Sequence, residues 1–205
     1  MTITEDIKYV GVNDHDIDLF EGQYQVENGM AYNSYVITDD KIAIFDTVDA
    51  HFSEEWLANI KNVLGDAKPD YLIIQHMELI TPQVNWHIYG ELSRYHNCGK
   101  RESITIMKQF FGCDYVEHQL VVKEKDTLEL GKHTLTFVAA PMVHWPEVIM
   151  TYDPMQKYSS AQMHLENSVH WMLRKTGLAK QDAIISELLE NTALRYRHFL
   201  RSCRS

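Results

Sequence analysis

A histidine and a glutamate stand close together at the end of an apolar run. Residues 71–74 are typical of a buried strand, and the chain continues through His76 and Glu78, two positions apart. Side chains at positions i and i+2 of an extended segment point to the same side. Imidazole and carboxylate side chains both bind metals. His76 and Glu78 are therefore candidate ligands of one metal ion.

The residues after this pair do not continue a metal-binding pattern. Leu79, Ile80 and Thr81 come next, and none of them carries a carboxylate or an imidazole. Taken alone, His76 and Glu78 are more simply explained as a polar pair at a strand end that bonds to neighbouring backbone.

A third histidine, His144, lies in a loop that we expect over residues 141–146. Trp145 follows it directly, so His144 can be explained either as a metal ligand or as a loop histidine that packs on Trp145. The residues alone leave both explanations open.

Other polar residues favour structural roles. Asp46 ends an expected strand, where a turn or cap role is the default. Glu21 and the acidic run over residues 14–18 fit loop and cap positions, and His15 remains ambiguous.

The bulk composition limits the kinds of function. The 205 residues suffice for one sizeable domain, and the net charge of −10 argues against nucleic acid or an anionic membrane as partner. Three cysteines without a CxxC pair give neither a zinc ribbon nor a disulfide framework. No signal peptide is evident, and no apolar run approaches the roughly 18 residues of a spanning helix, so we expect a cytoplasmic protein.

The elements that must position these residues follow from periodicity and turn signals. Over the first 78 residues we expect strands at 8–12, 33–38, 41–46 and 70–75, a hairpin turn at 39–40, and a helix from Ser53 to Leu64 that Gly65 stops. Residues 79–103 show neither the helical spacing nor the strand-like alternation of apolar residues clearly. Beyond them we expect a helix at 104–112, strands at 119–122, 127–130, 133–139 and 148–152, and helical spacing at 177–200.

Six stretches of the chain match one known family. They are Val12-Asn13-Asp14-His15-Asp16-Ile17-Asp18-Leu19-Phe20-Glu21-Gly22, Tyr32-Asn33-Ser34-Tyr35, Phe45-Asp46-Thr47-Val48-Asp49, Gln75-His76-Met77-Glu78, Gln109-Phe110-Phe111-Gly112 and Ala140-Pro141-Met142-Val143-His144-Trp145-Pro146. With these stretches, residues 1–78 and 104–153 resemble the N-terminal diiron domain of flavodiiron proteins, also called A-type flavoproteins.

The resemblance implies a single metallo-β-lactamase-like domain over residues 1–205. Such a domain is an αββα sandwich of the α/β class, with two mixed sheets and outer helices, here incomplete at its C-terminus. The family reduces O2 or NO at a non-haem diiron site. In the intact family the electrons come from FMN in a flavodoxin-like domain, which we expect to be absent here, and from rubredoxin or a similar donor. Intact relatives form homo-oligomers.

By resemblance, His76 and Glu78 would bind one iron and His144 the other. The family also needs an aspartate at position 80, where this chain has Ile80, and a bridging aspartate in a region that reads Ser159-Ser160-Ala161-Gln162-Met163. A late histidine of the family is missing as well. The resemblance therefore implies a fragment of a flavodiiron oxidoreductase that is inactive as it stands.

The family pattern stops and resumes abruptly, at residues 79–103 and again from about residue 155. Gradual divergence would weaken the pattern everywhere, so we infer a shifted reading frame in these two segments. Back-translated codons of residues 158–171, read two bases later, permit a sequence like the family's bridging-aspartate loop. Residues 85–100, read one base later, also permit a family-like sequence.

This hypothesis has structural consequences. Residues in the two segments, Cys98 among them, would be accidental surface or loop residues. The strand at 148–152 would lack neighbours and leave an unpaired sheet edge, which predicts marginal solubility.

Two rival functions remain open at this level. One is a zinc-dependent hydrolase of the same fold, against which Glu78 and the missing aspartate argue. The other is a non-enzymatic remnant or interaction module that binds intact subunits.

Overall fold

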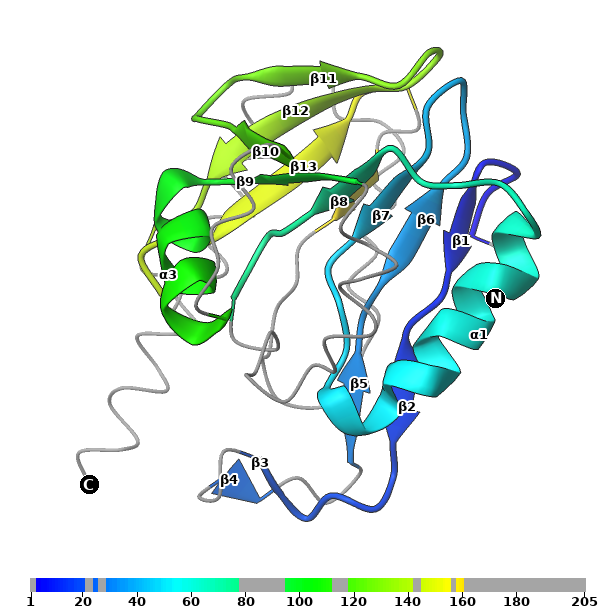
Figure 1. Ribbon diagram of the computed structural model, residues 1–205, viewed down its shortest axis with the longest axis vertical. Coiled ribbons are helices and arrows are strands. Elements are labelled where there is room, and N and C mark those ends of the chain that lie inside the picture. The colour runs from blue at the N-terminus through cyan, green and yellow to red at the C-terminus, as the bar shows by residue number, and fades with distance from the viewer. Residues whose placement is uncertain are drawn as a thin grey trace.

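Two β-sheets that pack face to face form the body of the molecule, and two helices lie against the outer face of the larger sheet (Figure 1). The computed structural model describes residues 3–20, 24–25, 29–77, 95–111, 118–141, 145–155 and 158–160. None of the helices in this described part has the length and apolar character needed to cross a membrane.

The larger sheet has six strands in the order β1-β6-β7-β8-β9-β10. The strands are β1 (Ile7–Tyr9), β6 (Tyr35–Ile37), β7 (Ala43–Phe45), β8 (Tyr71–Ile73), β9 (His96–Gly99) and β10 (Gln119–Val121). The strand β6 is antiparallel to both of its neighbours, β1 and β7, whereas β7 to β10 run parallel to one another. Parallel neighbours need crossover connections; η1 (Ala50–Phe52) with α1 (Ser53–Leu64) connects β7 to β8, and α3 (Arg101–Phe111) connects β9 to β10.

The smaller sheet is antiparallel throughout its described strands. It consists of β11 (Thr127–Glu129), β12 (Thr134–Ala139), β13 (Ile149–Asp153) and β14 (Tyr158–Ser160), in that order. Two short ribbons, β2 (Val12–Asp14) with β5 (Met30–Tyr32) and β3 (Leu19–Phe20) with β4 (Tyr24–Gln25), extend from the larger sheet at the lower end in Figure 1.

The core follows from strands that are apolar on both faces. Along β7, Ile44 faces a cluster shared with Trp56 of α1 and Met107 of α3. Its neighbour Phe45 points to the opposite face and packs with Phe137 of the smaller sheet. Because side chains alternate along a strand, this central strand joins the helix layer and the second sheet.

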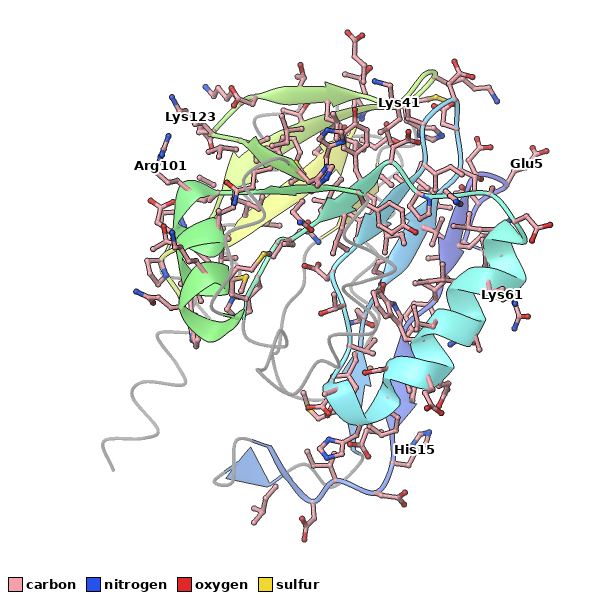
Figure 2. All side chains as sticks on the ribbon, viewed as in Figure 1. Glu5, His15, Lys41, Lys61, Arg101 and Lys123 are labelled. Carbon is pink, nitrogen blue, oxygen red and sulfur yellow. The ribbon has the colours of Figure 1, made fainter. Side chains whose placement is uncertain are left out.

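The helix α1 has the bounds that the sequence predicts. Trp56 and Ile60 are buried and lie one turn apart, whereas Lys61 points outward from the helix (Figure 2). The Trp56 indole Nε1 donates to Ser34 Oγ at 2.9 Å, which ties the helix to the sheet. Gly65, with φ at +59°, ends the helix in a conformation that favours glycine.

The predicted fold class is confirmed, and so are the hairpin of β6 and β7, the strand β8 and the strands β10 to β13. The helix predicted at 104–112 begins earlier, at Arg101. The helical tail predicted at 177–200 lies outside the described residues.

Two expectations about the irregular segments are wrong. Residues 96–99 form β9 between β8 and β10, and Cys98 is fully buried in the core between the sheets rather than exposed or in a loop. The strand β13 is paired on both sides, by β12 and by β14, so it leaves no open edge. Backbone hydrogen bonding explains both outcomes, because a strand between two others needs few specific side chains.

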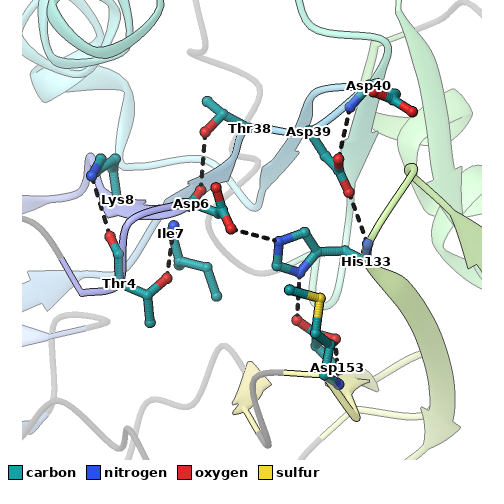
Figure 3. A network of polar contacts seen from close by, with 10 residues as sticks. Thr4, Asp6, Ile7, Lys8, Thr38, Asp39, Asp40, His133 and Asp153 are labelled. Carbon is teal, nitrogen blue, oxygen red and sulfur yellow. Dashed lines mark hydrogen bonds and ion pairs between the residues drawn. The ribbon is translucent and has the colours of Figure 1, made fainter.

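A buried histidine joins four separate parts of the chain (Figure 3). His133 Nδ1 lies 2.7 Å from Asp153 Oδ2 at the end of β13, and His133 Nε2 lies 3.4 Å from Asp6 Oδ2 before β1. The backbone N–H of His133 donates to Asp39 Oδ2 in the turn between β6 and β7. The His133 side chain is fully buried, so its carboxylate partners offset the loss of water.

Replacing His133 with alanine should destabilise the chain by about 3 kcal/mol, because the substitution leaves the buried carboxylate of Asp153 without its partner. The free energy of unfolding in urea measures the effect. His15→Ala is the matched control, since His15 is exposed in the loop after β2 (Figure 2), and its change should stay within about 0.5 kcal/mol. Equal stability of the two variants would contradict the proposed role of His133.

Candidate metal centre

His76 lies just beyond the C-terminal end of β8, at the edge where the parallel strands of the larger sheet end. Ligands of open α/β sheets bind at this kind of edge. The side chain of His76 is only 1% exposed, and its neighbours Gln75 and Met77 are buried as well. A histidine buried this deeply needs polar partners.

Glu147 provides such a partner from the other sheet. It precedes β13, is completely buried, and places Oε1 2.6 Å from His76 Nδ1. The same oxygen accepts a hydrogen bond from the backbone N–H of Met77 at 3.1 Å. Burial on its own would raise the pKa of Glu147, but the hydrogen bonds from His76 and Met77 outweigh it and hold the pKa below its ordinary value.

An aromatic ring fixes the other side of the histidine. The Trp145 indole meets the His76 imidazole edge to face, with ring centroids 5.4 Å apart and an interplanar angle of 83°. Lys100, between β9 and α3, donates from Nζ to the carbonyl of Pro146 at 2.8 Å and so ties the residue after Trp145 to the larger sheet.

A second buried carboxylate supports the end of β8. Asp46 follows β7 with φ at +53°, and its two oxygens accept from the backbone N–H and from Nε2 of Gln75, at 2.7 and 2.8 Å. Gln75 Oε1 in turn accepts from Thr151 Oγ1 on β13 at 3.0 Å. Complete burial raises the pKa of Asp46 to about 7, although the hydrogen bonds from Gln75 oppose the shift.

The end of β8 and the start of β13 are therefore joined at several points. Besides the contacts of Glu147 and Thr151, the backbone N–H of Ile149 donates to the carbonyl of Gln75 at 3.0 Å. We call this set of contacts between residues 75–77 and 147–151 the cross-sheet seam. It gives His76 a single position, which a metal ligand requires.

Of the three ligands that the resemblance implies, the described residues include His76 alone. Glu78 and His144 lie outside the described residues, as does Glu21. Among the described residues no group of three or more His, Cys, Asp or Glu side chains is arranged to hold a metal. The alternative explanation of His76 as bonded to neighbouring backbone does not describe its partner, because Glu147 is 71 positions away.

The environment of His76 fits a metal ligand. Histidines that bind metals almost always donate their other ring nitrogen to a carboxylate, a carbonyl or water, and His76 Nδ1 faces a carboxylate in this way. A metal would then be bound through Nε2.

Sequence reasoning missed Glu147. The residue follows Trp145-Pro146 directly, so its place beside a motif that resembles a known family was the available signal. Nothing in the sequence, however, indicates that a residue before β13 reaches the end of β8.

The substitution Asp46→Asn should change how the stability of the metal-free chain depends on pH. The pKa of Asp46 is about 7 in the folded chain and near 4 in the unfolded chain, so folding binds a proton between these values and wild-type stability falls as pH rises through this window. Asparagine does not titrate, and the stability difference between the two proteins should shift by at most about 4 kcal/mol from pH 4 to pH 7. Urea unfolding in the presence of a chelator measures the free energy of unfolding of both proteins at each pH. If the stabilities of the two proteins changed in parallel with pH, the raised pKa of Asp46 would be contradicted.

Comparison with known proteins shows what the chain is similar to. No family model matches the chain. It is 31% identical over 198 residues to a nitric oxide reductase of Moorella thermoacetica, covering 96% of this chain and 48% of that protein. It is 32% identical over 157 residues to an anaerobic nitric oxide reductase flavorubredoxin homolog of Escherichia coli O157:H7, covering 74% of this chain and 37% of that protein.

A solved structure gives the same result. The rubredoxin oxygen:oxidoreductase of Desulfovibrio gigas superposes with a TM-score of 0.70 at 30% identity, covering 76% of this chain and 39% of that one. The chain thus spans about half or less of the length of the relatives it matches. These relatives do not favour the zinc-hydrolase alternative. The predicted resemblance is confirmed: the chain is homologous to the flavodiiron proteins over the N-terminal, metallo-β-lactamase-like part of their length.

Proposed function

We propose that the chain is the metal-binding module of a flavodiiron-type oxidoreductase, a class that reduces O2 or NO, and that it is inactive as it stands. The observation that carries this proposal is the buried His76 at the end of β8, held at Nδ1 by the carboxylate of Glu147. The relatives named as nitric oxide reductases and as an oxygen oxidoreductase support the reaction class.

The proposed ligands are those that the sequence indicates. His76 and Glu78 would hold one iron, and His144 would hold the other. A bound iron pair would supply the redox chemistry on O2 or NO. The contribution of the described residues is to bind and orient: Glu147 and Trp145 hold the imidazole of His76, and Asp46 holds the backbone beside it.

The incomplete ligand set supports the absence of activity. Ile80 stands where the family has an aspartate, and the region around Ser159 and Ser160 lacks the bridging aspartate. Without a carboxylate bridge, two cations at short distance repel each other with little compensation. Three ligands shared between two metals would bind both weakly.

The remaining parts of the proposal follow the intact family. Residues 1–205 would form one domain, and the segments at 79–103 and from about 155 would be the divergent parts. Electrons would come through FMN from rubredoxin or a similar donor, in a cytoplasmic homo-oligomer. Neither nucleic acid nor a membrane would be a partner.

The purified chain, reconstituted anaerobically with Fe²⁺ and desalted, should retain far less than two irons per chain. The physical reason is the missing carboxylate ligands, and elemental analysis against protein concentration measures the ratio. A stoichiometry near two irons would contradict the proposal that the site is incomplete.

Restoring one carboxylate should strengthen binding. The substitution Ile80→Asp should raise the affinity for Fe²⁺ by about tenfold or more, since it adds a charged oxygen ligand of the kind that iron prefers. Ile80→Asn is the matched control, because asparagine has nearly the same shape and polarity as aspartate but no negative charge. Equal affinities of the two variants would argue against a ligand at position 80.

The reading-frame hypothesis has its own test. We expect independent sequencing of the coding DNA around codons 78–103 and 153–163 to show single-base differences that restore the family's aspartates. The activity would then belong to the corrected protein. A frame that stands as given would mean that His76, Glu78 and His144 are remnants of a broken site.

A further inference from the structure

We propose that Glu147 is a positioning residue, which fixes the imidazole of His76 with its proton on Nδ1 and its Nε2 directed to a metal. The inference rests on the proposed function only in taking the metal as the partner of Nε2. The hydrogen-bond geometry at Nδ1 stands independently of it.

The first argument is the geometry at one oxygen. Glu147 Oε1 lies 2.6 Å from His76 Nδ1 and 3.1 Å from the backbone nitrogen of Met77. The N–H of Met77 can only donate, so Oε1 acts as an acceptor towards it. An oxygen that accepts both bonds requires a proton on Nδ1 of the imidazole, and in the neutral ring Nε2 then carries the lone pair that a metal ligand needs.

The second argument is the restricted rotation of the ring. The His76 side chain is 1% exposed, and the edge-to-face contact with Trp145 opposes flipping of the ring about the Cβ–Cγ bond. A flip would also break the short contact to Glu147. The ring is therefore held both in its orientation and in its tautomer.

The third argument compares the two buried histidine–carboxylate pairs, which lie at opposite ends of β13. At the far end, both oxygens of Asp153 are used: Oδ2 by His133 and Oδ1 by the backbone N–H of Met155. At the near end, Glu147 Oε2 is buried without a hydrogen-bond partner among the described residues.

This difference bears on what each pair does. A buried carboxylate with only one oxygen engaged is a costly way to stabilise a fold, because an apolar side chain of similar size would avoid the desolvation. At Asp153, both carboxylate oxygens have hydrogen-bond partners, so a structural role accounts for this pair. The pair at Glu147 is explained better by the orientation that it imposes on His76.

The test uses the full chain, made metal-free and titrated with Co²⁺. Glu147→Met removes the acceptor while keeping the length of the side chain, and Glu147→Gln keeps a carbonyl oxygen that can accept both bonds. We expect Glu147→Met to weaken Co²⁺ binding by about tenfold to a hundredfold. Glu147→Gln should remain within about threefold of the wild type, as a conservative replacement of a positioning residue.

Two-bond ¹H–¹⁵N spectra of the histidine rings give a readout that does not depend on metal. We expect the wild type and Glu147→Gln to carry the His76 proton on Nδ1, and Glu147→Met to lose this single tautomer. A wild-type His76 with its proton on Nε2 would overturn the proposal, whether or not any variant folds. So would a folded Glu147→Met protein with unchanged tautomer and Co²⁺ affinity.

Asp153→Asn is the matched structural control. This substitution alters a buried carboxylate at the other end of β13, which also faces a histidine. It should lower the stability of the chain while leaving the Co²⁺ affinity and the His76 tautomer unchanged. A loss of Co²⁺ affinity equal to that of Glu147→Met would overturn the positioning role, since general destabilisation would then explain both.

A different result would show that the proposed function, rather than the role of Glu147, is wrong. His76→Gln with Co²⁺ affinity equal to the wild type would remove His76 from the ligand set. The ring spectra would still decide whether Glu147 fixes the tautomer.

Discussion

At one end of the two sheets, a single buried oxygen fixes the position of His76. Glu147 Oε1, before β13, accepts bonds from His76 and Met77, which follow β8 in the other sheet. Apolar packing brings sheets together, but it tolerates small shifts of one strand end against another. Short, directional bonds to one atom remove that freedom. The orientation of His76 therefore depends on the register between the two sheets.

That dependence explains why so many buried polar side chains lie in and beside the cross-sheet seam. Asp46 and Gln75 lie in an interior where each unpaired polar atom would cost roughly 1–3 kcal/mol. Their bonds run from β7 through Gln75 to Thr151 on β13, so one side chain connects three strands. The chain thus uses bonded carboxylates at the edge where a site could be built, and most of the remaining packing between the sheets is apolar, apart from the His133–Asp153 pair at the other end of β13.

The sequence predicts the local elements well and the contacts between them poorly. The apolar runs of β6 and β7 on either side of a turn, and the helical spacing that includes Trp56, are local signals, and the corresponding elements form as expected. The strand β9 escapes prediction because Asn97, Cys98 and Gly99 have no strand-like pattern, yet β8 and β10 satisfy its backbone on both sides. Glu147 escapes because its partner His76 is 71 positions away, and no local rule links them.

The strand β9 also shows that the fold tolerates changes of side chain that a metal site does not. A central parallel strand is held mainly by its backbone bonds and by the exclusion of water, so a small, buried side chain such as Cys98 suffices there. A metal site has no such tolerance, because each ligand must carry a particular donor atom. The ligand candidate His76 follows β8 rather than lying within it, so replacing it removes no ladder bond. The two sheets and the orientation of His76 can therefore persist although Ile80, two positions after Glu78, carries no donor atom for a metal.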